Sequence, residues 1–310
     1  MVINTHSQDR LNRCAYPAPL QPGDRLRVIA PSGALRELEM FQQGIDLWRS
    51  WGFEVVVDSA VQAQWGYLAG TDQHRRVQLA NALADPACRG ILCARGGYGG
   101  TRLLESWLWP RPQPQKWLIG FSDITSLLWS LARQGIVGVH GPLLTTLAAE
   151  PPWSQQRLKN LVMGQSLSPL QGEGWGGGGV TGWLLPANLT VATHLLGTAH
   201  EPDLTGAILV LEDVTEAPYR VDRMLTHWRL MGKFDRLKGI ALGRFSRCEP
   251  TSAGPSLTVE EVLRDRLGDL GLPVVSGLPI GHDGENAALP VGILARLDGD
   301  SGLLETLSTN

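Results

Sequence analysis

Short apolar runs alternate with amphipathic helical patterns through the first half of the chain, and this alternation constrains the fold more than any other feature. The predicted strands and helices follow one another at 26–30, 38–48, 55–57, 72–84, 90–94, 101–107, 117–119 and 124–131. Strands that are separated by helices predict a parallel sheet covered by helices on both faces. We therefore expect an α/β domain over residues 22–147.

The sequence changes character over residues 148–180. Pro151-Pro152 is followed by a glycine-rich insert at 172–179 that ends in four consecutive glycines. Glycine is costly to order, so we expect a mobile linker here. A second α/β domain is predicted over 181–310, and residues 1–21 form a polar N-terminal extension that we expect to be loose. The strands and helices predicted in the second domain are 189–196, 207–211, 221–230, 239–242, 259–267 and 293–297.

Composition excludes several classes of protein. The 310 residues carry a net charge of −3 and no basic stripe, so nucleic-acid binding has no electrostatic support. No apolar run approaches the length of a membrane span, and the first residues lack the pattern of a secretory signal. The four cysteines are scattered and form no C-x-x-C pair, which predicts a cytoplasmic protein with reduced thiols.

Ser122 stands at a predicted strand-to-helix turn, Gly120-Phe121-Ser122-Asp123. A hydroxyl at this point projects toward the positive end of the helix, where free backbone N–H groups can hold an oxyanion. The turn resembles the nucleophile elbow of serine hydrolases, although Ile124 occupies the position of the last glycine in G-x-S-x-G. The alternative is that Ser122 or Asp123 is only a helix N-cap.

Two further segments follow predicted strands, where α/β proteins bind ligands. The run Arg95-Gly96-Gly97-Tyr98-Gly99-Gly100 could hold an anion on its backbone N–H groups, or could be only a tight turn. It lacks the final glycine of the dinucleotide fingerprint, which disfavours a nucleotide-dependent oxidoreductase. Glu212 ends an apolar strand, where a carboxylate can orient an imidazole or can be a simple surface charge.

His282 lies in a loop with flanking glycines, Gly281-His282-Asp283-Gly284. With Glu285 it forms an H-x-x-E pair, a known way to hold zinc, but a third ligand is absent from the neighbouring sequence. Ser122, Glu212 and His282 occur in the order nucleophile, acid and base, at spacings of 90 and 70 residues. These spacings place the nucleophile in one domain and its partners in the next, so we expect a site in the cleft between domains.

These motifs together resemble the LD-carboxypeptidases, a family of serine peptidases that includes murein tetrapeptide carboxypeptidases and microcin C immunity peptidases. The resemblance covers about residues 22–307 and implies a flavodoxin-like N-terminal domain, a C-terminal swivelling β-rich α/β domain and a homodimer. It is carried by Arg-Gly-Gly-Tyr-Gly at 95–99, Gly-Phe-Ser-Asp at 120–123, His-Gly-Pro at 140–142, Leu-Glu-Asp at 211–213, Pro-Tyr-Arg-Val-Asp-Arg-Met-Leu at 218–225 and Gly-His at 281–282.

The resemblance also implies roles for individual residues. Ser122 would be the nucleophile, His282 the general base and Glu212 its orienting acid, with Glu216 as the alternative acid. No metal or other cofactor is implied. The oxyanion hole would be formed by the backbone N–H groups of Gly97 and Asp123. Arg95, Gly96 and Tyr98 would bind substrate. Arg95, Arg220 or Arg223 could pair with its carboxylates, or each could form only a structural ion pair.

The activity implied is release of D-alanine from the cytoplasmic tetrapeptide L-Ala–D-Glu–diaminopimelate–D-Ala in peptidoglycan recycling. One alternative is an immunity-type peptidase that cleaves a peptidyl-nucleotide antibiotic and needs an aromatic side chain to stack on the base. Another is a non-catalytic muropeptide-binding protein. The insert at 172–179 and the N-terminal extension depart from the family pattern, and both bear on the shape of the pocket.

Overall fold

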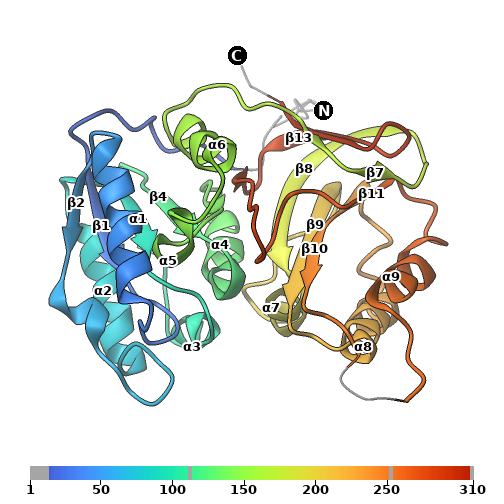
Figure 1. The fold of residues 1–310 in the computed structure, drawn as a ribbon, viewed down its shortest axis with the longest axis horizontal. Coiled ribbons are helices and arrows are strands. Elements are labelled where there is room, and N and C mark those ends of the chain that lie inside the picture. Colours follow the sequence, from blue (N-terminus) through green and yellow to red (C-terminus); the bar gives the residue numbers. More distant parts are fainter. Residues whose placement is uncertain (1–13, 111–113, 251–253, 308–310) are drawn as a thin grey trace, which may run out of the picture.

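The chain builds two β-sheets that lie side by side, each flanked by helices (Figure 1). The computed structural model describes residues 14–110, 114–250 and 254–307. The predicted strands and helices agree with the observed ones within a few residues, and the helix predicted over 72–84 has those bounds. Among the helices of these ranges, none combines the length and the apolarity that crossing a membrane requires.

The first sheet has five parallel strands in the order β2-β1-β3-β4-β5, which is the flavodoxin-like order. A sixth strand, β12 (Leu289–Pro290), comes from near the C-terminus and pairs antiparallel with β5. The expected parallel-sheet fold is therefore confirmed, with one strand supplied from the far end of the chain. The parallel strands are β1 (Arg25–Ile29), β2 (Glu54–Val57), β3 (Cys88–Cys93), β4 (Trp117–Gly120) and β5 (Val139–His140).

Helices cover both faces of this sheet because its strands are apolar on both sides. Neighbouring residues of β4 alternate between two hydrophobic clusters: Leu118 belongs to the cluster that contains Leu79, and Ile119 belongs to the one that contains Phe41. The helices of this half are α1 (Leu38–Ser50), η1 (Ser59–Gln62), α2 (Asp72–Ala84), α3 (Gly100–Leu104), η2 (Ser122–Ile124), α4 (Thr125–Ala132), α5 (Leu144–Leu147) and α6 (Pro152–Val162).

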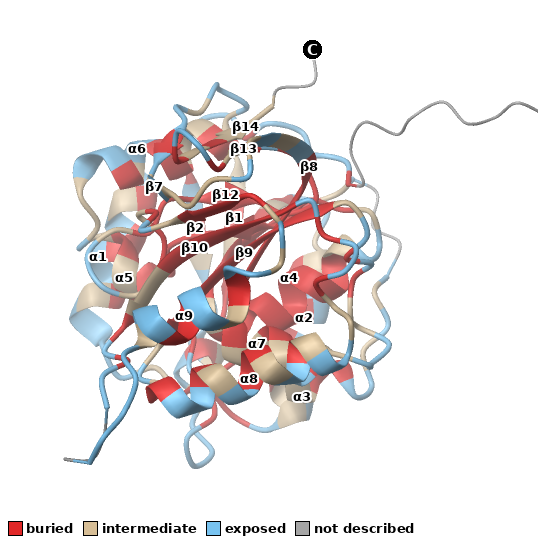
Figure 2. Ribbon diagram, turned by 90° about the vertical axis from the view of Figure 1, so that its right-hand side faces the viewer, coloured by how far each residue is buried: buried red, intermediate tan, exposed pale blue. Residues whose placement is uncertain are grey.

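The second sheet is mixed, in the order β6-β14-β13-β8-β9-β10-β11-β7. The four strands β8 to β11 are parallel, and the outer strands pair antiparallel. Helices α8 and α9 turn buried sides toward the sheet and exposed sides outward (Figure 2). The elements are β6 (Leu170–Gln171), β7 (Glu173–Gly174), β8 (Gly179–Asn188), α7 (Leu189–Leu195), β9 (Ala207–Val214), α8 (Pro218–Leu230), β10 (Gly239–Ser246), α9 (Val259–Leu267), β11 (Val274–Ser276), β13 (Leu294–Asp298) and β14 (Leu303–Thr306).

The glycine-rich insert belongs to the second sheet and is not the structureless linker that its composition predicts. Strands β6 and β7 pair with β14 and β11, and helix α6 precedes them. The N–H of Gly176 donates to the carbonyl of Gly299 at 2.8 Å, and a Cβ on Gly174 would lie 2.1 Å from that same carbonyl oxygen. The glycines are needed here because two backbones approach more closely than a side chain permits.

Residues 14–20 of the N-terminal extension are more ordered than the polar composition of the extension predicts. Residues 1–13 lie outside the described residues, but residues 14–20 run along the body of the protein. Ala15 N–H donates to the carbonyl of Gly135, and Leu20 N–H donates to that of Val162, both at 2.8 Å. Leu20 is fully buried, so this part of the extension is held by packing and by backbone hydrogen bonds.

Candidate active site

Ser122 occupies a sharp turn between β4 and α4. Its φ angle is +62°, in the left-handed region, which costs a non-glycine residue about 1–3 kcal/mol. Gly120 is required two residues earlier, since a Cβ there would lie 2.9 Å from the Ile124 side chain. Ile124 thus fills the space above Gly120. The turn has the form of a nucleophile elbow, with the serine in the left-handed conformation.

The three side chains predicted to form a triad are in hydrogen-bond contact. Ser122 Oγ lies 3.0 Å from Nε2 of His282, and Nδ1 of the same ring lies 2.8 Å from Oε2 of Glu212. The Glu212 side chain is 1 % exposed and that of His282 is 15 % exposed, so only the serine end of this chain faces accessible space. The arrangement is that of a hydroxyl, an imidazole and a buried carboxylate able to transfer a proton from the hydroxyl.

Strand register explains why Glu212 is held in one orientation. Glu212 on β9 lies beside Asn188, the last residue of β8. The Asn188 amide donates to Oε1 of Glu212 at 3.2 Å, which leaves Oε2 for His282. Sequence reasoning missed Asn188. The signal was a polar residue that ends an apolar run and precedes a predicted helix, where its Oδ1 also caps α7 by accepting from Val191 N–H.

Asp213 follows Glu212, and its Oδ1 accepts from the same Asn188 amide at 3.1 Å. Its Oδ2 accepts hydrogen bonds from the N–H and the hydroxyl of Thr190, both at 2.8 Å. Burial, together with the charge of Glu212, raises the pKa of Asp213 to about 6. Two adjacent buried carboxylates therefore differ in environment, and only Glu212 contacts the imidazole.

The alternative roles considered for neighbouring residues do not match the contacts. Glu216 lies 3.5 Å from the guanidinium of Arg220, whereas the His282 ring contacts Glu212. The Glu285 carboxylate accepts hydrogen bonds from Arg244 and Trp153, so these contacts do not match the H-x-x-E zinc site in which Glu285 and His282 would bind one metal ion. Across the described ranges, no group of three His, Cys, Asp or Glu side chains is arranged to hold a metal ion.

The contacts also do not match the alternative in which Ser122 or Asp123 is only a helix N-cap. No side chain caps η2 or α4 through a hydrogen bond. The carboxylate of Asp123 accepts instead from Gly100 N–H at 2.6 Å, at the start of α3. Burial raises the pKa of Asp123. Ser122 is therefore free of a capping role, and its hydroxyl is directed to His282.

The glycine loop after β3 packs directly on Ser122. A Cβ on Gly96 would lie 3.2 Å from Ser122 Cβ, and the Gly96 carbonyl accepts from Gly33 N–H at 3.0 Å. Gly97 has φ +102°, a conformation that favours glycine. This close approach brings the backbone of the glycine loop beside Ser122.

The side chains of this loop have partners of their own. Arg95 forms an ion pair with Glu37, with Nε 3.1 Å from Oε2. Tyr98 is about half exposed, and its ring centroid is 5.9 Å from that of the exposed Tyr67. Of the three predicted substrate-binding residues, Gly96 lies against Ser122, Arg95 is paired with a carboxylate, and Tyr98 has an exposed ring next to another tyrosine.

His140 is fully buried behind the triad on β5. Its ring stacks edge-on to Phe121, which also packs against His282, and both of its nitrogens lack hydrogen-bond partners in the described structure. Burial lowers the pKa of His140 to about 4 from its ordinary 6.5, so the folded protein holds this ring neutral.

The buried His140 makes stability depend on pH. Between pH 6.5 and about pH 4, His140 is protonated in the unfolded chain but stays neutral in the folded protein. The free energy of unfolding therefore falls as the pH falls through this window, by about 3 kcal/mol in total. Replacing the ring by one that cannot titrate, in His140→Phe, should remove that part of the slope. Urea unfolding of both proteins at pH 7 and pH 4 measures it. Equal losses in both proteins would contradict the assignment.

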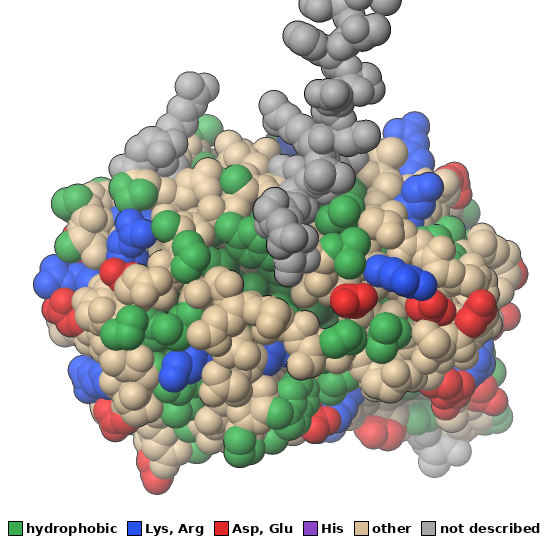
Figure 3. All heavy atoms as spheres, turned by 90° about the horizontal axis from the view of Figure 1, so that it is seen from above, with side chains coloured by type: hydrophobic (Ala, Val, Ile, Leu, Met, Phe, Trp, Pro, Cys, Tyr) green, Lys and Arg blue, Asp and Glu red, His purple; other side chains and the backbone are tan. Residues whose placement is uncertain are grey.

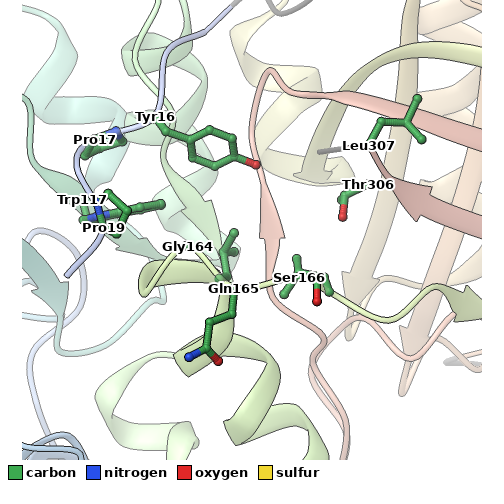
Figure 4. Close-up of a pocket in the computed structure, with 11 residues that line it drawn as sticks. Tyr16, Pro17, Pro19, Trp117, Gly164, Gln165, Ser166, Thr306 and Leu307 are labelled. Carbon is green, nitrogen blue, oxygen red and sulfur yellow. The ribbon is translucent and has the colours of Figure 1, made fainter. Parts of the chain in front are cut away.

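A cavity of about 210 Å³ lies at the end of the first sheet opposite to the Ser122 turn (Figure 4). Trp117, which lines it, begins β4, whereas Ser122 follows the end of that strand. The other wall carries Thr306 and Leu307. Figure 3 views the molecule from above, and no histidine of the described residues is visible on that face.

Comparison with known proteins places this geometry in a family. Residues 26–141 match the LD-carboxypeptidase N-terminal domain and residues 181–297 match the LD-carboxypeptidase C-terminal domain. A putative carboxypeptidase of Synechocystis sp. is 58 % identical over 291 residues, covering 94 % of this chain and 97 % of the relative. The murein tetrapeptide carboxypeptidase of Pseudomonas aeruginosa is 35 % identical over 302 residues, covering 90 % and 95 %.

The fold agrees with a solved structure of the same kind. The muramoyltetrapeptide carboxypeptidase from Oxalobacter formigenes superposes with a TM-score of 0.81 at 29 % identity, covering 90 % of this chain and 97 % of that one. The chain belongs to the LD-carboxypeptidase family, a family of serine hydrolases. The resemblance inferred from the motifs is thereby confirmed.

Proposed function

We propose that this protein is a serine LD-carboxypeptidase that releases the C-terminal D-alanine of murein tetrapeptide in peptidoglycan recycling. The observation that carries the proposal is the continuous chain from Ser122 through His282 to Glu212. Two relatives whose names refer to murein peptides, in Pseudomonas aeruginosa and among solved structures, support the choice of substrate. On the family resemblance we also propose a cytoplasmic location and a homodimer.

The proposed reaction is acyl transfer through a covalent intermediate. His282 accepts the proton of Ser122 through Nε2 while Oγ attacks the amide carbon. Glu212 accepts from Nδ1–H, which keeps the ring in the tautomer that leaves Nε2 free and stabilises the imidazolium. His282 then protonates the departing amine of D-alanine, and the C–N bond breaks. In the second half, His282 accepts a proton from water as it attacks the acyl carbon, the ester bond to Ser122 Oγ breaks, and His282 returns the proton to Oγ.

The oxyanion of the tetrahedral intermediate would be held by backbone N–H groups of Gly97 and Asp123. The contact of Gly96 with Ser122 supports this role, because it brings the glycine loop to the reacting oxygen. Loss of one such donor typically costs about 10²–10³ in rate. Arg95, Gly96 and Tyr98 would line the peptide, and the Arg95–Glu37 pair would position the cation toward a peptide carboxylate.

One observation favours a second candidate, an immunity-type peptidase acting on a peptidyl-nucleotide. The exposed rings of Tyr67 and Tyr98 lie next to the glycine loop and could stack on a base. A non-catalytic muropeptide-binding protein is disfavoured, since binding does not need a buried carboxylate that orients an imidazole onto a strained serine.

The proposal is tested by mass spectrometry of products from the synthetic tetrapeptide L-Ala–D-Glu–diaminopimelate–D-Ala. We expect loss of one alanine residue, identified as the D enantiomer by D-amino-acid oxidase, at a rate unchanged by EDTA because no step uses a metal. A peptidyl-nucleotide incubated in parallel should be cut much more slowly. Faster cleavage of the peptidyl-nucleotide would favour the second candidate, and activity lost with EDTA but restored by zinc would refute the serine mechanism.

A further inference from the structure

The loop that presents His282 is held by the half of the protein that carries Ser122. We call residues 281–288 the His282 loop. Immediately after it, β12 joins the first sheet, where Leu289 pairs with His140 and His140 in turn pairs with Gly120. Ser122 lies two residues beyond Gly120. A ladder of three strands thus connects the end of the His282 loop to the nucleophile turn.

Glu150, just before α6, contacts the middle of this loop. Its Oε2 accepts from the backbone N–H of Asn286 at 2.8 Å and lies 2.8 Å from the hydroxyl of Ser154. Ser154 Oγ is also 3.1 Å from the Asn286 carbonyl. The one hydroxyl proton of Ser154 can be donated either to the Glu150 carboxylate or to the Asn286 carbonyl. Ser154 and Asn286 are fully buried, and Glu150 is half-buried. A carboxylate that accepts such bonds makes stronger contacts than a neutral acceptor.

Asn286 carries this constraint to the residue beside His282. Its side-chain Oδ1 accepts from the N–H of Gly281 at 3.3 Å, which closes the loop across its base. Gly281 has φ +137°, and a Cβ there would lie 3.2 Å from the carbonyl oxygen of Arg244, so the loop backbone lies close to that of Arg244 on this side. Displacing Asn286 would therefore displace the backbone that bears the imidazole.

We propose that Glu150 is a positioning residue, whose carboxylate fixes the His282 loop so that Nε2 of His282 stays within hydrogen-bond reach of Ser122. This inference rests on the proposed function in that it takes Ser122 as the nucleophile and His282 as its base. Glu150 itself touches neither the serine nor the imidazole in any contact described above. Its effect on the reaction would pass through Asn286 and Gly281.

Two substitutions separate positioning from simple stability. Glu150→Ala removes the acceptor, whereas Glu150→Gln keeps a carbonyl oxygen for Asn286 N–H and loses the charge. The matched control is Glu201→Gln, which alters a carboxylate paired with Lys233 before the start of β9, at the end of that strand remote from Glu212. Folding is followed by thermal unfolding, so that activity is compared among folded proteins only.

Three readouts are taken on each variant: kcat and KM for the tetrapeptide, the rate at which Ser122 displaces fluoride from a fluorophosphonate probe, and the downfield proton resonance of His282 Nδ1–H. A misplacement of about 1 Å can cost about 10²-fold in rate. We expect Glu150→Ala to lower kcat and the labelling rate about 10- to 100-fold, with KM within about threefold, and to shift or broaden the proton resonance. Glu150→Gln should recover most of the loss, and Glu201→Gln should match wild type.

The inference is overturned if folded Glu150→Ala keeps kcat and the labelling rate within about twofold of wild type. It is also overturned if KM rises while kcat and the labelling rate do not change. Failure of the proposed function gives a different result: wild type would release no D-alanine, yet Ser122 would still label, and labelling would still slow in Glu150→Ala. That result would refute the substrate and support the positioning role.

Discussion

Ser122→Ala is expected to lower the rate of peptide hydrolysis by about 10⁴–10⁶-fold while peptide still binds. The substitution removes the only atom that attacks the amide carbon in the proposed reaction. It leaves the glycine loop and the buried His282–Glu212 pair in place. The product assay by mass spectrometry measures the rate, and calorimetric titration with the tetrapeptide measures binding.

Stability should change little in this variant. Alanine keeps the same left-handed φ of +62° at position 122, so the backbone strain persists, and only one hydroxyl is lost. Ser50→Ala, on the exposed surface of α1, is the matched control and should retain full activity. A Ser122→Ala protein that keeps more than about a tenth of wild-type activity would exclude a serine nucleophile at this position.

Glu212→Gln is expected to lower kcat by about 10³–10⁴-fold, for a reason that the contacts specify. The Asn188 amide donates to Oε1, so the carbonyl oxygen of the new glutamine should take that position. Its NH₂ group would then face Nδ1 of His282, where it requires an acceptor. The ring would adopt the tautomer with the proton on Nε2, which cannot accept the proton of Ser122.

The test of this prediction includes a control that separates two nearby carboxylates. Glu216→Gln breaks the ion pair with Arg220 and should cost less than about tenfold in kcat. The downfield resonance of His282 Nδ1–H should disappear in Glu212→Gln and persist in Glu216→Gln. Equal losses of kcat in the two variants, or a larger loss in Glu216→Gln, would show that Glu212 is not the orienting acid.

Local patterns predicted most of the elements. The helices over 72–84 and 259–267 were predicted at their observed bounds, because apolar positions at helical spacing are a short-range signal. The glycine-rich insert was misjudged for a physical reason. Composition indicates the entropy cost of ordering glycines. It does not show that a neighbouring backbone, such as that of Gly299, lies so close that only glycine fits beside it.

The individual site residues could be named from the sequence because each ends a predicted strand or lies in a glycine-flanked loop. Motif order and family resemblance then assigned their roles. Asn188 and Glu150 could not be found in this way. Asn188 contacts Glu212 only because β8 and β9 pair in register, and Glu150 contacts Asn286 across 136 residues of chain. The local pattern marks Asn188 only as a candidate helix cap, and no local periodicity marks its contact with Glu212 or the contact of Glu150 with Asn286.

By itself the sequence determined the class of fold, the positions of strands and helices, and three candidate side chains that the structure brings into contact. The tertiary structure alone decided which carboxylate meets the imidazole, and how a loop from the C-terminal half comes to rest on the nucleophile's sheet. The reason is that spacing along the chain governs local conformation, whereas a distance of 3 Å between side chains 160 residues apart depends on how two packed sheets are joined.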